Sequence, residues 1–385
     1  MINIKDIIRF ILQVREAFYI GTGNLASSVI GAIFWLLLAS IVDSDVYGEI
    51  NYYIAFASLF AVVSLLGLDI QVMTFLPKGN KIIFTESFIL MLISSSIAAL
   101  IIFIMFSSIF LALLVIGNNI FVLTIAETLG NKKYRIYPII MLTNRILQLL
   151  LAIYLYIIFS IEGIIIGYAI PALIVGSLSI FHLQDIKYGL KLKFIRNKLK
   201  FAIYAYTFQI STVILIYIDK IILAPLFGFE TLGLYQFAFQ LLLFLAMIPM
   251  TLIQYLLPQE ASNISKVNIK KIGLGLSILL SVIFFIASPV AINTFFPKYI
   301  EAIDAARIMA FGIVPMSINA IINAELLAKE KSKIVMLGSL AYIITLIILF
   351  IILGNMFDVM GLALAVVLSA LFQSLVLLFA KIIIK

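Results

Sequence analysis

Residues 82–106 read IIFTESFILMLISSSIAALIIFIMF, and this stretch decides the fold class. Glu86 is its only charged side chain. An α-helix rises about 1.5 Å per residue, so about 20 apolar residues cross the hydrocarbon core of a bilayer. We therefore predict that this stretch is a membrane-spanning helix.

Stretches of the same kind recur along all 385 residues. Hydrophobic residues make up 64% of the chain and charged residues 11%, whereas a soluble domain carries about 25% charge. Water does not solvate a surface so poor in charge, which indicates that lipid is the solvent. We predict an all-α polytopic membrane protein of about twelve spanning helices, at 19–42, 50–76, 82–106, 107–129, 137–159, 163–183, 201–226, 232–257, 272–296, 302–328, 334–354 and 359–384. Only Ser107 and Ser108 mark the break between the third and fourth helices.

The basic residues predict the topology, because Lys and Arg are retained on the cytoplasmic side of a membrane. With the N-terminus inside, 22 of the 26 basic residues fall in inside segments, and acidic residues mark the outside turns. We therefore expect a multi-pass protein of the cell membrane with both termini in the cytoplasm. The net charge of +8 then reflects topology, so we expect no nucleic-acid partner.

Hydrophilic stretches indicate the domain organisation. Residues 1–18 place apolar and charged side chains on opposite faces of a helix, which is typical of an amphipathic helix on the membrane surface. A simple extension of the first spanning helix is the alternative. The basic stretch 184–200 lies near the midpoint and is the predicted cytoplasmic linker between an N-lobe at 19–183 and a C-lobe at 201–385.

An internal repeat relates the two halves. Residues 126–129 read AETL and residues 324–327 read AELL, an offset of 198 that Gly163 and Gly361 share. Residues 45–48 (DVYG) match residues 230–233 (ETLG) at a smaller offset. Each half has six helices, so the two lobes share one orientation and are related by a pseudo-two-fold axis along the membrane normal. Transporters often bind substrate between such halves.

Several short motifs carry a family resemblance: Leu66-Gly67-Leu68-Asp69, Tyr217-Ile218-Asp219-Lys220, Glu230-Thr231-Leu232-Gly233-Leu234-Tyr235 and Phe296-Pro297-Lys298-Tyr299. With them the chain resembles the polysaccharide-biosynthesis flippases of the multidrug/oligosaccharidyl-lipid/polysaccharide (MOP) exporter superfamily. That group includes the O-antigen-type lipid-linked oligosaccharide flippases and is related to the MATE exporters. The resemblance implies a MATE-like fold. It also implies translocation of a lipid-linked oligosaccharide from the cytoplasmic to the outer leaflet by alternating access.

Polar and charged residues inside the helices are the candidate functional residues, because such groups usually face a cavity or a partner in a bilayer. Arg145 lies roughly 12 Å into its helix and is suited to bind a pyrophosphate; pairing with Asp69 or Glu127 is the structural alternative. Asp219 and Lys220 point about 100° apart on a helix, so we expect them not to face each other, and Lys220 snorkelling outward is their alternative. The candidate cavity residues are Asn24, Arg145, Gln148, Asp219, Lys220, Gln236 and Gln240, and the candidate ion-coupling residues are Asp69 and Asp219. Helix packing is the alternative for Asn24, Gln236 and Gln240. For Asp69 the alternatives are a pair with an arginine and the cap of a helix break near Gly67.

Other polar residues receive structural interpretations. Glu127 and Glu325 occupy equivalent helix ends, and we expect solvated ion pairs with Lys133 and Lys331. His182 is interpreted as an interfacial residue. Asn319 and Asn323 are four positions apart on one helix and are expected to hold helices together.

Three other functions compete with the flippase. One is a cation-coupled multidrug or small-molecule exporter of the same superfamily; a second is a membrane polysaccharide polymerase or glycosyltransferase, and the third a scaffold without transport. The outside loops are only a few residues long, so we expect no enzyme. With no cysteine, one histidine and no phosphate-binding loop, we expect no metal and no cofactor. The expected partners are a lipid-linked glycan substrate, membrane lipid and polysaccharide-assembly proteins.

Overall fold

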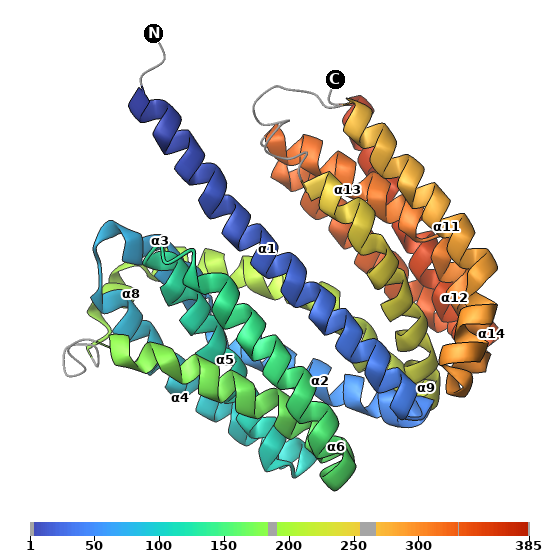
Figure 1. The fold of residues 1–385 in the computed structure, drawn as a ribbon, viewed down its shortest axis with the longest axis horizontal. Coiled ribbons are helices and arrows are strands. Elements are labelled where there is room, and N and C mark those ends of the chain that lie inside the picture. Colours follow the sequence, from blue (N-terminus) through green and yellow to red (C-terminus); the bar gives the residue numbers. More distant parts are fainter. Residues whose placement is uncertain (1–3, 184–190, 255–266, 330, 384–385) are drawn as a thin grey trace. The chain divides into compact units, whose positions relative to one another are not determined.

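The computed structural model describes residues 4–183, 191–254, 267–329 and 331–383, and these residues are almost entirely helical (Figure 1). The described part of the chain contains no β-strand, which confirms the all-α prediction. Its helices are α1 Ile4–Ile41, α2 Ser44–Leu65, α3 Leu68–Phe75, α4 Ile82–Phe106, α5 Ile109–Gly130, α6 Ile136–Gly176, α8 Lys193–Asn197, α9 Leu199–Gln254, α11 Val267–Phe295, α12 Ile303–Ala310, α13 Ile313–Ala328 and α14 Ser332–Ile383. Short 3₁₀ helices lie at Leu76–Lys78 (η1), Ser177–His182 (η2) and Pro297–Ala302 (η3).

Three of the long helices are interrupted by single residues with non-helical backbone angles. These residues are Ser160 in α6, Gly228 in α9 and Asp358 in α14. Among the described residues, nine helical stretches are long and apolar enough to cross a membrane, and division at these three residues gives twelve segments. The predicted count of about twelve is thereby confirmed.

Most predicted breaks lie where the sequence placed them, and two of the predicted spans are divided further. Ser107 adopts a left-handed conformation (φ 52°), and the Ser108 hydroxyl caps α5 by accepting the N–H of Leu111 at 3.4 Å. The helix predicted at 50–76 is instead divided into α2 and α3 at Leu66 and Gly67, which both have positive φ. The helix predicted at 302–328 is likewise divided into α12 and α13.

The chain forms two compact units. Unit 1 comprises Met1–Phe34 and Tyr52–Ile221, and unit 2 comprises Trp35–Asn51 and Ile222–Lys385. Helices α1, α2 and α9 each begin in one unit and end in the other. Helix α1 runs unbroken from residue 4, so the segment predicted to lie on the membrane surface is continuous with the first spanning helix. The surface position, the lobe boundaries and the linker remain predictions, and residues 184–190 of the linker lie outside the described residues.

A core in unit 1 joins α3, α4, α5 and the short helix α8. Ile195 of α8 is buried there together with Val72, Met91 and Leu123. The fully buried Glu86 of α4 accepts the backbone N–H of Ile195 at 2.9 Å. A carboxylate at the start of a helix is stabilised by the unpaired N–H groups and the helix dipole. Glu86 therefore fastens α8 to unit 1.

The turns inside α6 and α14 repeat each other in detail. Ser160 (φ 51°, ψ −131°) and Asp358 (φ 49°, ψ −131°) are 198 residues apart, the offset of the sequence repeat. A Cβ atom on Gly163 would lie 2.1 Å from the Leu155 carbonyl oxygen, and one on Gly361 would lie 1.9 Å from that of Leu353. Both turns are thus hairpins closed by main-chain contact, so the repeat extends to backbone geometry.

A second pair of equivalent glycines lies within unit 2. A Cβ atom on Gly48 would lie 1.9 Å from the Phe229 carbonyl oxygen, and one on Gly233 would lie 1.7 Å from that of Ser44. The same offset of 185 residues relates both the glycines and their contacts. The beginning of α2 and the second part of α9 therefore approach each other closely at backbone atoms.

The Phe296–Tyr299 motif closes the C-terminus of α1, within unit 2. Lys298 donates to the Ile41 carbonyl at 2.7 Å and pairs with Asp43 at 3.0 Å. The Tyr299 hydroxyl donates to the carbonyl of Val42 at 3.3 Å. Because the last carbonyls of a helix have no partner within it, these bonds give the motif a structural role.

Candidate functional site

Arg145 lies on the first part of α6 in unit 1, and no carboxylate of the described residues neutralises it. Its guanidinium donates to the Gln148 side-chain oxygen at 3.1 Å, across a spacing of three residues that places both on one helix face. No ion pair joins Arg145 to a carboxylate of the described residues. Asp69 and Glu127, the partners of the structural alternative, bond to other groups. Arg145 is therefore a partly buried cation whose charge is uncompensated in this part of the chain.

The buried aromatic side chain of Tyr168 lies within electrostatic range of Arg145. Tyr168, on the second part of α6, is buried, and the charge of Arg145 and the Tyr217 side chain both act on it. The Phe34 ring of α1 meets the Tyr168 ring edge-on, with centroids 5.3 Å apart. The neighbourhood of Arg145 thus contains the Gln148 amide and an aromatic wall formed by Tyr168 and Phe34, which suits a ligand with anionic and sugar-like parts.

Asn24 contributes to helix packing in the same unit. Its side-chain oxygen accepts a hydrogen bond from the Tyr137 hydroxyl at the start of α6. The neighbouring Gly23 allows this approach, because a Cβ atom there would lie 2.9 Å from the Cβ of Pro138. The bond ties α1 to α6 and leaves a role of Asn24 in a cavity as a prediction.

Asp219 and Lys220 face each other, contrary to the expectation from helical spacing. The Lys220 ammonium lies 3.0 Å from the Asp219 carboxylate and donates to the Ile216 carbonyl at 3.0 Å. Lys220 is only 7% exposed, so it does not snorkel outward. The correction has a simple cause: four methylene groups let the ammonium bend back across the 100° between adjacent residues. Lys220 is thereby largely neutralised.

Asp69 contacts Gln209 rather than a cation. The Gln209 amide donates to Asp69 Oδ2 at 3.1 Å, which joins α3 to α9. Asp69 Oδ1 and Gln209 Oε1 are both buried, and neither has a hydrogen-bond donor among the described residues. Two buried acceptors without a donor are costly. A proton or a monovalent cation bound here would satisfy both.

Gln236 and Gln240 lie in the second part of α9, within unit 2. Both are buried, and Gln236 Oε1 has no donor within the described residues. Their predicted place beside the unit 1 candidates remains a prediction. No cluster of three or more His, Cys, Asp or Glu side chains suited to a metal ion occurs in the part of the chain that the structure describes.

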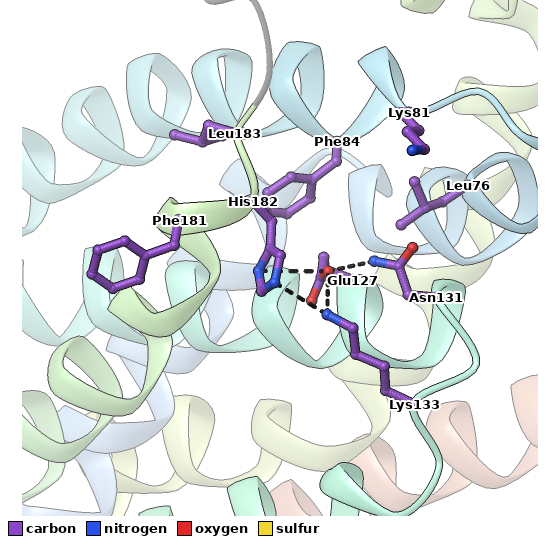
Figure 2. Close-up of a pocket in the computed structure, with 9 residues that line it drawn as sticks. All are labelled: Leu76, Lys81, Phe84, Glu127, Asn131, Lys133, Phe181, His182 and Leu183. Carbon is purple, nitrogen blue, oxygen red and sulfur yellow. Dashed lines mark hydrogen bonds and ion pairs between the residues drawn. The ribbon is translucent and has the colours of Figure 1, made fainter.

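A cavity of about 570 Å³ lies in unit 1 at the end of α5 (Figure 2). Sequence analysis did not predict a cavity at this place. Glu127 is 2% exposed and pairs with Lys133 at 3.4 Å, so this ion pair forms but its carboxylate is buried rather than solvated. His182 Nδ1 lies 3.7 Å from Glu127, and Asn131 also donates to that carboxylate. The lining residues are Leu76, Lys81, Phe84, Glu127, Asn131, Lys133, Phe181, His182 and Leu183.

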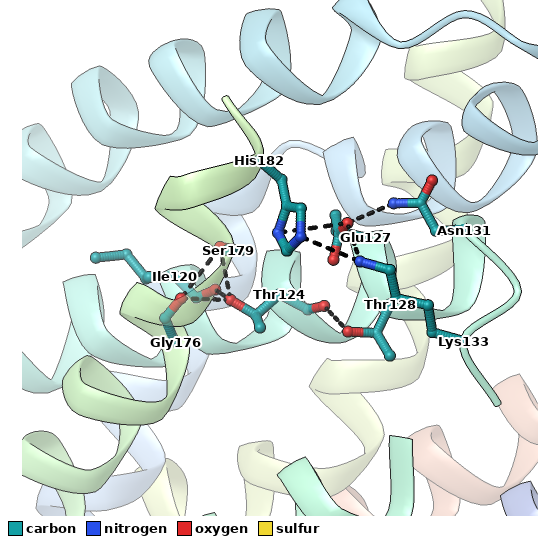
Figure 3. Close-up of polar contacts among 9 residues, drawn as sticks. All are labelled: Ile120, Thr124, Glu127, Thr128, Asn131, Lys133, Gly176, Ser179 and His182. Atoms are coloured by element: carbon teal, nitrogen blue, oxygen red, sulfur yellow. Dashed lines mark hydrogen bonds and ion pairs between the residues drawn. The ribbon is translucent and has the colours of Figure 1, made fainter. Parts of the chain in front are cut away.

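A hydroxyl network holds one wall of this cavity in place (Figure 3). The Thr124 hydroxyl of α5 lies 2.6 Å from the Gly176 carbonyl and 2.9 Å from the Ser179 hydroxyl. These contacts fasten η2 to α5, and η2 carries His182 to the Glu127 carboxylate.

The equivalent Glu325 pairs with different lysines from those expected. Lys270 of α11 lies 2.5 Å from its carboxylate, and Lys381 of α14 also pairs with it. The predicted partner Lys331 is not joined to Glu325 by any ion pair that the described residues form. Packing of α11 and α14 against α13 brings these distant lysines to Glu325. Asn319 behaves as predicted, since it bonds to Gln373 and Ser374 of α14.

Comparison with known proteins identifies the fold. No family model and no curated protein matches this sequence. The lipid II flippase MurJ, in an inward closed conformation, matches with a TM-score of 0.58 and 17% identity over 96% of this chain and 87% of that one. An inward-facing multidrug resistance MATE transporter of the MOP superfamily matches with a TM-score of 0.69 and 11% identity over 92% of this chain and 94% of the other.

An outward-facing MATE transporter of the same superfamily also matches, with a TM-score of 0.58 and 12% identity over 96% of this chain and 95% of that one. Identities this low show the fold alone. The predicted MATE-like fold is confirmed, and with its apolar helices the chain is a multi-pass membrane protein.

Proposed function

We propose that this protein is a flippase that moves a lipid-linked oligosaccharide from the cytoplasmic to the outer leaflet of the cell membrane by alternating access, with both termini in the cytoplasm. The fold shared with a lipid II flippase and with MATE transporters supports a transporter of the MOP superfamily. The choice of substrate rests on the site.

The uncompensated Arg145 carries the proposal. A guanidinium inside a membrane protein is costly unless a partner neutralises it, and among the described residues its bonded partner is the neutral Gln148. A pyrophosphate supplies the missing negative charge and accepts paired hydrogen bonds from the guanidinium. Gln148 and the aromatic wall then suit sugar hydroxyls and rings.

The pairing of Lys220 shifts its proposed role. Because Asp219 already neutralises Lys220, this pair is suited to shape the cavity or respond to an ion rather than to supply the main charge for a phosphate. Arg145 is then the principal anion contact of the proposed substrate site.

A cation-coupled exporter of the same superfamily is the second candidate. The buried oxygens of Asp69 and Gln209 favour it, because together they could accept a proton or a small cation. The MATE transporters among the structural neighbours also favour it. A polymerase or glycosyltransferase is a weaker candidate, since the structural neighbours are transporters.

The test measures translocation of a fluorescent lipid-pyrophosphate oligosaccharide by the purified full chain in proteoliposomes. We expect Arg145→Gln to lower the rate about tenfold or more, because a hydrogen bond to a charged group contributes about 1.5–3 kcal/mol. Arg145→Lys should retain part of the activity, since lysine keeps the charge but not the paired geometry. The matched control is Arg307→Gln, because Arg307 has a carboxylate partner, Asp304, at 3.6 Å.

Wild-type rates in folded Arg145→Gln protein would remove Arg145 from the site. Absence of any protein-dependent translocation, with or without proton or sodium gradients, would favour the cation-coupled exporter, provided that the protein elutes as a folded species.

A further inference from the structure

The cavity beside Glu127 contains donors that its internal bonds leave unused. The Lys133 ammonium has three N–H donors, and two of them face Glu127 at 3.4 Å and His182 Nε2 at 3.1 Å. His182 Nε2 then acts as an acceptor and positions the lysine. Lys81 lines the same cavity, and no ion pair with any carboxylate of the described residues engages it. One donor of Lys133 and all those of Lys81 therefore remain for a ligand.

The charges of the cavity favour a monoanion. Glu127 is deeply buried and offsets Lys133, and Lys81 leaves a surplus of one positive charge when His182 is neutral. Asn131 and Lys133 both donate to Glu127 Oε1, so this oxygen is already engaged within the cavity. A phosphodiester carries one negative charge and only acceptor oxygens, which matches this surplus and these donors.

One side of the cavity continues into an apolar stripe. Phe181 lines the cavity and is 86% exposed, and Leu178 and Ile174 precede it at helical spacing and are 51% and 57% exposed. These side chains share one face of η2 and α6. In a membrane-spanning chain such a face contacts acyl chains. A ligand with a phosphate in the cavity and hydrocarbon along this stripe fits both surfaces.

The equivalent position in unit 2 has a different set of ion pairs. There Glu325 takes two lysines, Lys270 and Lys381, in direct ion pairs. Among the described residues, Glu127 forms an ion pair with one lysine, Lys133. Lys81 directly precedes α4, much as Lys270 lies near the start of α11, but no ion pair of the described residues includes Lys81. In the part of the chain that the structure describes, the two equivalent glutamates thus differ in how many lysines pair with them.

We propose that this cavity binds the phosphodiester headgroup of an anionic membrane phospholipid, with Lys81 and Lys133 on the phosphate, His182 positioning Lys133, and the acyl chains along the stripe of Phe181. Basic pockets among helices on the cytoplasmic side of a membrane are suited to such headgroups. The site is separate from Arg145 and does not depend on the proposed transport function.

The experiment is native mass spectrometry of the full-length protein in detergent, titrated with phosphatidylglycerol or with phosphatidylcholine of the same acyl chains. We expect tighter binding of phosphatidylglycerol. Lys81→Gln should weaken it about tenfold or more beyond the effect of Lys132→Gln, because a charge-assisted hydrogen bond is lost. Lys132 is the matched control: it is an exposed lysine of the same turn as Lys133 and does not line the cavity.

A second variant separates lipid from free phosphate. Phe181 is exposed, so Phe181→Ser should fold normally, and we expect it to weaken phosphatidylglycerol binding while leaving binding of soluble glycerol phosphate unchanged. Equal affinity for the two lipids, or equal effects of Lys81→Gln and Lys132→Gln, would overturn the proposal, since general surface attraction then accounts for the binding. Glycerol phosphate that competes as well as the lipid would also overturn it.

Discussion

Substitution of Gly163 or Gly361 by alanine should destabilise the protein by similar amounts. The added Cβ atoms would lie 2.1 and 1.9 Å from carbonyl oxygens, whereas real Cβ contacts essentially never fall below 3.0 Å. The two arms of each hairpin must therefore separate by about 1 Å, and the obstacle is backbone that no rotamer change can move. Overpacking of this kind typically costs about 1–3 kcal/mol.

Gly275→Ala is the matched control, because Gly275 lies inside α11 and nothing stands within 4 Å of its missing side chain. Alanine in an open helical position is favoured over glycine by about 1 kcal/mol, so the control should gain stability while the hairpin variants lose it.

The assay is the fraction of detergent-solubilised protein that still elutes as a monodisperse peak after heating, since the absence of cysteine rules out thiol-reactive dyes. We expect the midpoint to fall by several degrees for both hairpin variants and to rise slightly for the control. Wild-type midpoints for Gly163→Ala and Gly361→Ala would refute the steric reasoning. A loss in only one of them would refute the structural equivalence of the two hairpins.

Three further substitutions test individual polar contacts between helices. Glu86→Ala should speed hydrogen exchange in α8 roughly tenfold, because a buried charged acceptor is lost, and Glu86→Gln should do so less; equal exchange in both variants would contradict a role for the acceptor. Asn319→Leu should lower the free energy of unfolding by about 0.6–1.7 kcal/mol, the range for interhelical bonds in membranes, and an unchanged heating midpoint would oppose this. Glu325→Gln should leave Lys270 and Lys381 facing each other without a carboxylate, and so lower the midpoint of the heating curve. Adding Lys270→Gln should restore part of that midpoint. If it does not, repulsion between the lysines is not the cause of the loss.

The spanning helices could largely be predicted, because each needs only length and hydropathy. The third helix begins and ends at the predicted residues 82 and 106, where lysine precedes it and serine follows it. The break at Leu66 and Gly67 was considered only as an alternative, and the break before Ile313 was missed, since both lie within apolar sequence that hydropathy does not divide. Gly67 was the only local signal of the first break.

The candidate site was predictable only where contacts are local. The bond from Arg145 to Gln148 follows from helical spacing, whereas the pairing of Lys220 with Asp219 depends on how a long side chain bends. The partners of Glu325 come from helices 55 and 56 residues away in sequence, and the cavity beside Glu127 needs four separate elements. Neither the partners of Glu325 nor this cavity could be predicted from the spacing of residues in a single sequence.

The tight turns at Ser107, Ser160, Gly228 and Asp358 have a practical consequence for anyone who labels or captures this protein. On the side predicted to be outside, the chain reverses or breaks there within one or two residues and presents very few side chains. An antibody, an epitope tag or a protease site at these places has almost no loop to occupy, and an insertion would disturb backbone angles that the hairpins require. Single cysteines in place of Ser107 or Ser160, in a chain that has no other cysteine, are therefore the least disruptive reporters of that face, because serine and cysteine differ by one atom.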